Sequence, residues 1–127
     1  MNQAILEHVN VTVGDPKATA DMLCDIFGWQ IRWKGDAKDG GTTYHVGGAD
    51  SYVAVYSKGG DAKAGDSYET LGAMNHIGVV VDDIEATDVR AQKAGFATHS
   101  HADYEPGKRF YFDAHDGIEI EVVSYIS

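Results

Sequence analysis

The chain has 127 residues, with 10 Lys and Arg against 20 Asp and Glu, and a formal net charge of −10. This length allows one ordinary domain or two half-domains that share a core, and an apolar fraction of 43% suffices for a packed interior. The acidic charge argues against nucleic acid and anionic membranes as partners, because both are bound through clustered Lys and Arg.

The apolar runs are too short for a membrane-spanning helix or a signal-peptide core, so we expect neither. Cys24 is the only cysteine, which excludes an intrachain disulfide. We therefore expect a reducing, cytoplasmic setting.

An internal repeat relates the two halves of the chain. HVNVTVGDPKATA over 8–20 aligns with HIGVVVDDIEATD over 76–88, which places His8 on His76 at an offset of 68 residues. Further along, Tyr44 aligns with Tyr111 at an offset of 67. A repeat at a nearly constant offset indicates two copies of one supersecondary unit, so the two histidines should occupy equivalent places.

The first half begins with a strand over 8–13, in which polar residues alternate with valines. A helix follows, capped by Asp15, begun by Pro16 and ended by Gly28. We expect strands near 29–33, 42–47 and 51–57, and a flexible loop over 34–41.

The second half repeats this order. We expect a strand over 76–81, a helix from Asp83 to Gly95, and strands near 96–100, 109–114 and 117–125. The prediction is therefore an α+β fold of two βαβββ modules, forming a curved mixed sheet around a cavity. One domain would span 1–127, with module 1 over 4–58, a linker over 59–73 and module 2 over 74–126.

Strand alternation places polar residues of both modules on the faces that the helices leave open. The predicted cavity lining includes Asn10 and Glu119, together with His8, His76 and Glu121. Two imidazoles and one carboxylate suit a borderline divalent ion and leave positions open for water or substrate. Taken singly, each of these residues is more often structural or solvated, and a scaffold whose histidines are only structural stays open.

Three segments of the sequence resemble the vicinal oxygen chelate superfamily, which includes glyoxalase I, extradiol dioxygenases, fosfomycin-resistance transferases and bleomycin-resistance proteins. They are EHVNVTVGD with CDIFGW, NHIGVVVDDIEAT with KAGF, and the closing RFYFDAHDGIEIEVV. The resemblance implies the two-module fold, a divalent ion (Fe, Mn, Zn or Ni) on His8, His76 and Glu121, and a homodimer that binds a small molecule.

The sequence departs from the family pattern at Ala54, where many metal-dependent members carry a fourth ligand. This departure favours a three-ligand pattern, which resembles that of the dioxygenases and the fosfomycin transferases. A lyase or isomerase of the glyoxalase type remains an alternative. Both three-ligand groups have a tyrosine near the place of Tyr111, where it can hydrogen-bond a substrate oxygen.

Other residues are candidates for the reaction or for binding. We expect His99 and His101 to share a strand face, and we nominate His101 as a general base. Substrate would contact Asn10 and an aromatic wall formed by Trp33, Tyr52 and Tyr56.

Two classes of function follow. The first is a metal-dependent enzyme that binds adjacent substrate oxygens, dioxygenase-like or lyase/isomerase-like. The alternative is a bleomycin-resistance-type protein that sequesters a ligand without catalysis.

Overall fold

The computed structural model describes residues 2–63, 65–104 and 107–126. The chain divides into two compact units, Met1–Asp61 and Ala62–Ser127, and the boundary falls inside the predicted linker. Among the described residues, the helices are too short and too polar to cross a bilayer.

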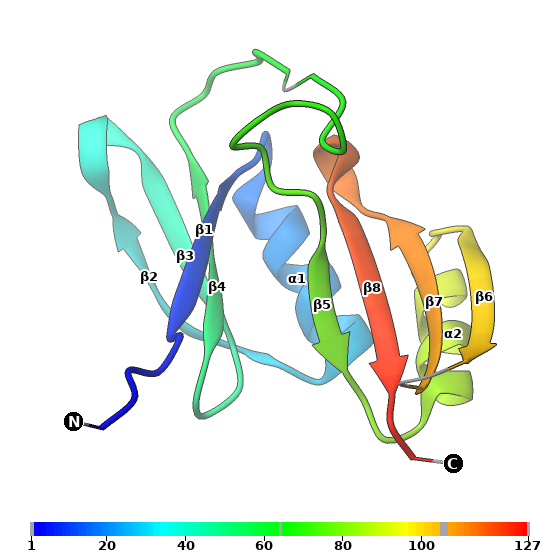
Figure 1. The fold of residues 1–127 in the computed structure, drawn as a ribbon. Coiled ribbons are helices and arrows are strands. Elements are labelled where there is room, and N and C mark those ends of the chain that lie inside the picture. Colours follow the sequence, from blue (N-terminus) through cyan, green and yellow to red (C-terminus); the bar gives the residue numbers. More distant parts are fainter. Residues whose placement is uncertain (1, 64, 105–106, 127) are drawn as a thin grey trace. The chain divides into compact units, whose positions relative to one another are not determined.

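The first unit follows the predicted order of elements (Figure 1). Strand β1 (His8–Thr12) is followed by helix α1 (Pro16–Phe27) and by strands β2 (Gln30–Asp36), β3 (Thr42–Gly47) and β4 (Tyr52–Ser57). The sheet order is β1-β4-β3-β2, with β1 parallel to β4 and the other pairs antiparallel. The predicted loop over 34–41 is in part strand, because β2 continues to Asp36.

The second unit repeats this topology. It contains β5 (Ile77–Val80), α2 (Ile84–Lys93), β6 (Thr98–Tyr104), β7 (Gly107–Asp113) and β8 (Glu119–Ser124), in the sheet order β5-β8-β7-β6. Among the residues that the structure describes, two α-helices and two four-stranded mixed sheets confirm the α+β class and the duplicated βαβββ order.

Both helices begin with the same cap. The side chain of Asp15 accepts a hydrogen bond from the backbone N–H of Ala18 at 3.1 Å, and Asp83 accepts from Ala86 at 3.0 Å. Such caps satisfy backbone donors that have no partner within the helix. The repeated helix start seen in the sequence is therefore a repeated physical device.

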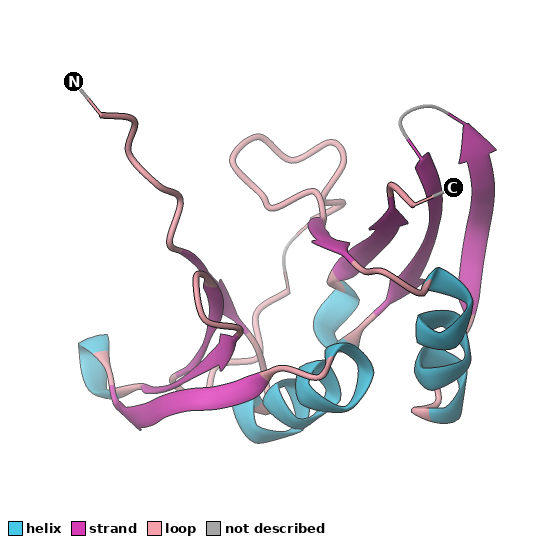
Figure 2. Ribbon diagram, turned by 90° about the horizontal axis from the view of Figure 1, so that it is seen from below, coloured by secondary structure: helices cyan, strands magenta, loops and turns pink. Residues whose placement is uncertain are grey.

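Each helix packs against one face of its own sheet, as Figure 2 shows. In the first unit Val46, Val53 and Val55 lie in this core, and in the second Phe112, Ile120 and Val122 do. The alternate residues of the same strands point to the other, open face. This division of faces is what strand alternation predicts.

The strand register corrects the repeat alignment in β3 and β7. His45 pairs with Ala54 in β3–β4, and Tyr111 pairs with Glu121 in β7–β8. Ala54 and Glu121 are repeat equivalents, so the partner of Tyr111 is His45, at an offset of 66. The predicted equivalence of Tyr44 and Tyr111 is wrong by one residue, which is enough to reverse the face.

A β-bulge corrects a second expectation. The register of β6 shifts between His99 and Ala102, and Ser100 has a positive φ of 57°. The extra residue sends His99 to the open face, stacked on Tyr111, and turns His101 to the helix side. The expectation that His99 and His101 share a face is therefore wrong.

Candidate functional site

Glu121 is the centre of a polar cluster on the open face of the second unit. His76, directly before β5, has its Nε2 3.3 Å from Oε1 of Glu121. The other oxygen, Oε2, accepts hydrogen bonds from Arg109 and from the hydroxyl of Tyr111, both at 2.9 Å. Glu121 is 15% exposed, so its charge is balanced by groups within the protein as much as by water.

The His76 ring is oriented by its other nitrogen. Nδ1 lies 2.7 Å from Oδ1 of Asn75, an oxygen that only accepts. In the neutral form of the ring, a proton on Nδ1 leaves the lone pair of Nε2 facing Glu121. This is the tautomer that a metal ligand needs, and the hydrogen bond to the second nitrogen is typical of metal-binding histidines.

Tyr111 lies between the two histidines of this face. Its ring meets His76 edge-on at 6.0 Å and stacks with His99 at 6.3 Å. Burial raises the pKa of the Tyr111 hydroxyl, and the hydrogen bond to Glu121 raises it further. The hydroxyl therefore remains a protonated donor at neutral pH.

The open face of the first unit holds a concave pocket of about 710 Å³. Its lining includes four residues predicted for the site: His8, Asn10, Tyr52 and Tyr56. Ala54, at the place equivalent to Glu121, also lines it and leaves room where a carboxylate would stand. The pocket is therefore built from the residues that strand alternation predicts.

A row of rings begins in this pocket with His8, Tyr52 and His45 and continues to Trp33, which lies outside the pocket lining. Tyr52 stacks with His8 at 4.8 Å and with His45 at 4.5 Å, and Trp33 tilts against His45 at 5.1 Å. Arg32 lies over the Tyr52 ring, 4.8 Å from its centre. A bulge in β2 between Ile31 and Trp33 brings Arg32 and Trp33 to this common face.

His8 is oriented as His76 is. Its Nδ1 lies 2.8 Å from a carboxylate oxygen of Glu7, the repeat equivalent of Asn75. A carboxylate only accepts, so Nδ1 carries a proton, and in the neutral form of the ring Nε2 is available as a ligand. His8 belongs to the first unit, whereas His76 and Glu121 belong to the second.

His45 is a site residue that the sequence analysis missed. Burial lowers the pKa of its imidazole, and the charges of His8 and Arg32 lower it further. Alternation along 42–47 could have placed His45 on the open face with Thr43. The alignment of Tyr44 with Tyr111 concealed it.

His101 lies on the helix side of its sheet. Its Nε2 is 2.9 Å from Oδ2 of Asp88 on α2, and its ring stacks on the buried Phe110 at 5.6 Å. With Asp88 it borders a separate shallow pocket of about 380 Å³. The role of general base stays a prediction, and in the second unit it is His99 that shares the face of Tyr111.

The spacing of His76 and Glu121 fits a shared metal ion. Ligand atoms about 2.0–2.2 Å from one ion lie roughly 3.0–3.6 Å apart in tetrahedral or octahedral geometry. The observed 3.3 Å falls in this range. Because Arg109 and Tyr111 use only Oε2, Oε1 is left for an ion.

A family model described as the Glyoxalase/Bleomycin resistance protein/Dioxygenase superfamily matches residues 5–122. The chain belongs to this superfamily. Comparison with curated proteins gives no significant match. Membership accounts for the duplicated fold, and it leaves the reaction open, since one scaffold serves many chemistries.

Solved structures of the superfamily resemble the chain over nearly its whole length. A glyoxylase/bleomycin resistance protein/dioxygenase domain from Frankia sp. EAN1pec has 20% identity and a TM-score of 0.82, covering 97% of this chain and 98% of that one. The fosfomycin resistance protein FosX from Mesorhizobium loti has 22% identity and a TM-score of 0.73, covering 97% and 92%. A FosX mutant from Listeria monocytogenes, complexed with Mn(II) and 1S,2S-dihydroxypropylphosphonic acid, has 18% identity and a TM-score of 0.76, covering 96% and 93%.

Proposed function

We propose that the chain is a divalent-metal-dependent enzyme that binds adjacent oxygens of a small molecule at a site formed by His8, His76 and Glu121. The observation that carries this proposal is the 3.3 Å distance between Nε2 of His76 and Oε1 of Glu121. Nδ1 of His76 already contacts Asn75, and Oε2 of Glu121 already accepts from Tyr111. The mixed nitrogen and oxygen donors suit Fe, Mn, Zn or Ni.

Residues around these ligands have distinct parts in the proposal. Glu7 and Asn75 hold the two histidine rings with Nε2 available. The bound ion would act as a Lewis acid on substrate oxygens. Tyr111 donates to Glu121 in the metal-free protein and would donate to a substrate oxygen once one is bound.

The small molecule would lie against the open face of the first unit. Asn10 and Tyr56 line its pocket, and the rings of Tyr52 and Trp33 offer an aromatic wall. Tyr56 is fixed, because its hydroxyl donates to the backbone oxygen of Lys38 at 2.6 Å. His101 as general base, the homodimer and the cytoplasmic setting belong to the same proposal and await their own tests.

Metal content and affinity test the proposal. Protein purified without chelator should carry one strongly bound ion that His8→Ala, His76→Ala and Glu121→Gln each remove. His115→Ala is the matched control, because His115 is exposed on a short turn and should leave the ion bound. Absence of any stoichiometric ion in the parent protein, with no binding of added Fe, Mn, Zn or Ni, would falsify the proposal.

A metal-free binding protein is the second candidate, and Arg109 favours it. Its guanidinium already neutralises Glu121 over 2.9 Å, so the carboxylate needs no ion for its charge to be balanced. The acidic chain and the row of rings would suit a planar cation. Titration with a basic glycopeptide antibiotic in the presence of chelator separates the two, because only the binding protein should retain the ligand without metal.

A further inference from the structure

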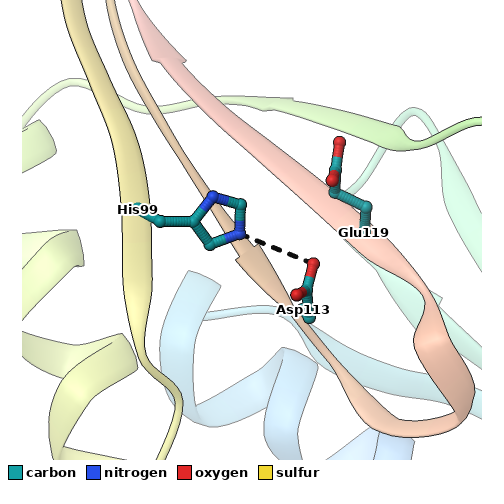
Figure 3. A group of neighbouring side chains, drawn as sticks. All are labelled: His99, Asp113 and Glu119. Atoms are coloured by element: carbon teal, nitrogen blue, oxygen red, sulfur yellow. Dashed lines mark ion pairs between the residues drawn. The ribbon is translucent and has the colours of Figure 1, made fainter.

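A second group of metal-ligating side chains lies on the open face of the second unit. His99 on β6, Asp113 at the end of β7 and Glu119 at the start of β8 lie close together, and Figure 3 shows the His99 ring facing the Asp113 carboxylate. Each offers one ligand atom, and these atoms all lie within 4.8 Å of one another. None of the three belongs to the site proposed above.

We propose that His99, Asp113 and Glu119 form a second divalent-cation site, contained entirely in the second unit. One imidazole and two carboxylates are the donors of zinc and manganese sites. Because all three residues belong to one compact unit, this site does not depend on how the two units associate.

The charges of this group call for a cation. Asp113 and Glu119 are direct partners across the antiparallel β7–β8 ladder. Like charges directly opposite each other in a sheet are destabilising, and the chain as a whole is strongly acidic. A bound cation would turn this repulsion into attraction.

The His99 ring presents a nitrogen that lacks a hydrogen bond. Its Nδ1 lies 2.9 Å from the hydroxyl oxygen of Ser100, the bulge residue with positive φ. Its Nε2 is shielded from solvent, makes no hydrogen bond among the described residues, and lies 3.5 Å from Oδ1 of Asp113. A shielded polar atom without a hydrogen bond is costly, and a metal bond would satisfy it.

Glu119 is also held from outside the group. The hydroxyl of Tyr68, in the segment before β5, donates a hydrogen bond to its Oε1. Outer hydrogen bonds of this kind orient metal ligands.

The spacing requires a small closing movement. Ligands about 2.0–2.2 Å from an ion lie roughly 3.0–3.6 Å apart, so the widest separation must shrink by about 1 Å. Asp113 can supply this movement, because its side chain is 67% exposed and its partner His99 is 41% exposed. Three protein ligands leave the remaining positions to water.

The group is a property of the second repeat alone. Strand register equates His99 with Trp33, Asp113 with Gly47, and Glu119 with Tyr52. The first unit therefore carries none of the three ligands, although it has the same backbone pairing. The fold does not require these side chains, which leaves metal binding as a reason for them.

Histidine side-chain NMR with Zn²⁺ as the probe tests this site. The chain has six histidines, and the ring signals of His99 are assigned by their loss in His99→Ala. We expect Zn²⁺ to shift the Nε2 signal of His99 saturably. Asp113→Asn should weaken this response about tenfold or more, and because Asp113 is exposed the substitution removes a ligand without removing a core contact. His101→Ala is the matched control and should leave the response of the His99 signal to Zn²⁺ unchanged.

The same spectra separate this site from the one proposed for the function. Zn²⁺ binding there would be read on the ring signals of His8 and His76, which Asp113→Asn should not alter. A His99 signal that does not respond to Zn²⁺, or that responds equally in the parent protein and in Asp113→Asn, would overturn the second site whatever His8 and His76 show.

Discussion

The hydroxyl of Tyr111 donates to Oε2 of Glu121 over 2.9 Å, while His76 approaches the other oxygen of the same carboxylate. Glu121 thus has one oxygen assigned to a neighbouring donor and one directed at an imidazole. This division fixes the orientation of the carboxylate before any ion binds, which lowers the cost of ordering it on binding.

Tyr111→Phe should therefore weaken divalent-metal affinity without unfolding the protein. Loss of an outer hydrogen bond to a ligand typically costs about tenfold or more in affinity. Competition between the protein and a chromogenic chelator for Zn²⁺ measures this effect. Tyr125→Phe, at an exposed tyrosine beyond the end of β8, is the control. Equal affinity in the parent protein and Tyr111→Phe would show that the hydrogen bond does not support a ligand.

Arg109 should stabilise the metal-free protein more than the metal-bound one. Its side chain is 14% exposed and pairs with Glu121, so Arg109→Met leaves a shielded carboxylate with one fewer partner. We expect a loss of about 1–3 kcal/mol in the free energy of unfolding with chelator present, and a smaller loss with saturating Zn²⁺. Urea unfolding under both conditions measures the difference.

Lys108→Met is the matched control for Arg109, one residue earlier on β7. Lys108 forms an exposed ion pair with Glu85, so its loss should change the free energy of unfolding by less than about 1 kcal/mol. If Arg109→Met lowers the free energy of unfolding equally with and without Zn²⁺, Zn²⁺ does not bind to the carboxylate that Arg109 neutralises.

Much of the fold was predictable because the sequence shows both the two-residue alternation of strands and the capping residues of helices. Strand alternation gave the open faces, and the caps Asp15 and Asp83 gave both helix starts. The same alternation placed Glu121 on the open face, where the structure brings it to His76.

Bulges and unequal loops were not predictable from the same patterns. A repeat alignment carries one offset through a whole segment, but the register offset changes from 67 in β4 to 66 in β3. Because of this one-residue difference, the alignment matched Tyr44 with Tyr111, and His45 was missed. Similarly, the bulge at Ser100 puts His99 and His101 on opposite faces of β6. The residue preferences of THSHADY do not predict this bulge.

His45 should make the stability of the protein depend on pH near neutrality. Burial lowers the pKa of His45, and the nearby charges of His8 and Arg32 lower it further, opposed by Glu7. The unfolded state then takes up a proton near pH 6.5 that the folded state resists. Stability is therefore complete above this value and falls as the pH decreases from about 6.5 towards the lower folded-state pKa.

Replacing this histidine should flatten that decline. We expect His45→Gln to lose less stability than the parent protein between about pH 7 and pH 5, as measured by urea unfolding at each pH. His115→Gln, on an exposed turn, should behave like the parent. A parent and His45→Gln that decline in parallel would assign the dependence to another group.

Asp88 should have the opposite dependence on pH. Burial raises the pKa of its carboxyl, but hydrogen bonds from Gln92, Thr98 and His101 outweigh burial and lower the pKa below its ordinary value. The charged form is therefore stabilised by folding. This contribution is present above about pH 4, the ordinary aspartate value, and is lost as the pH falls through the lower folded-state pKa.

Asp88→Asn should consequently destabilise the protein at pH 7 by about 1–2 kcal/mol, because it weakens charge-assisted hydrogen bonds that join α2 to β6. The deficit should shrink as the pH falls below about 4, where the parent loses the same charge. Asp103→Asn, at an exposed aspartate of β6, should cost less than about 0.5 kcal/mol at either pH. Asp88 on α2 also binds His101 on β6. If the loss of unfolding free energy in Asp88→Asn stays constant from pH 7 to pH 3, packing and not the carboxylate charge joins α2 to β6 at this point.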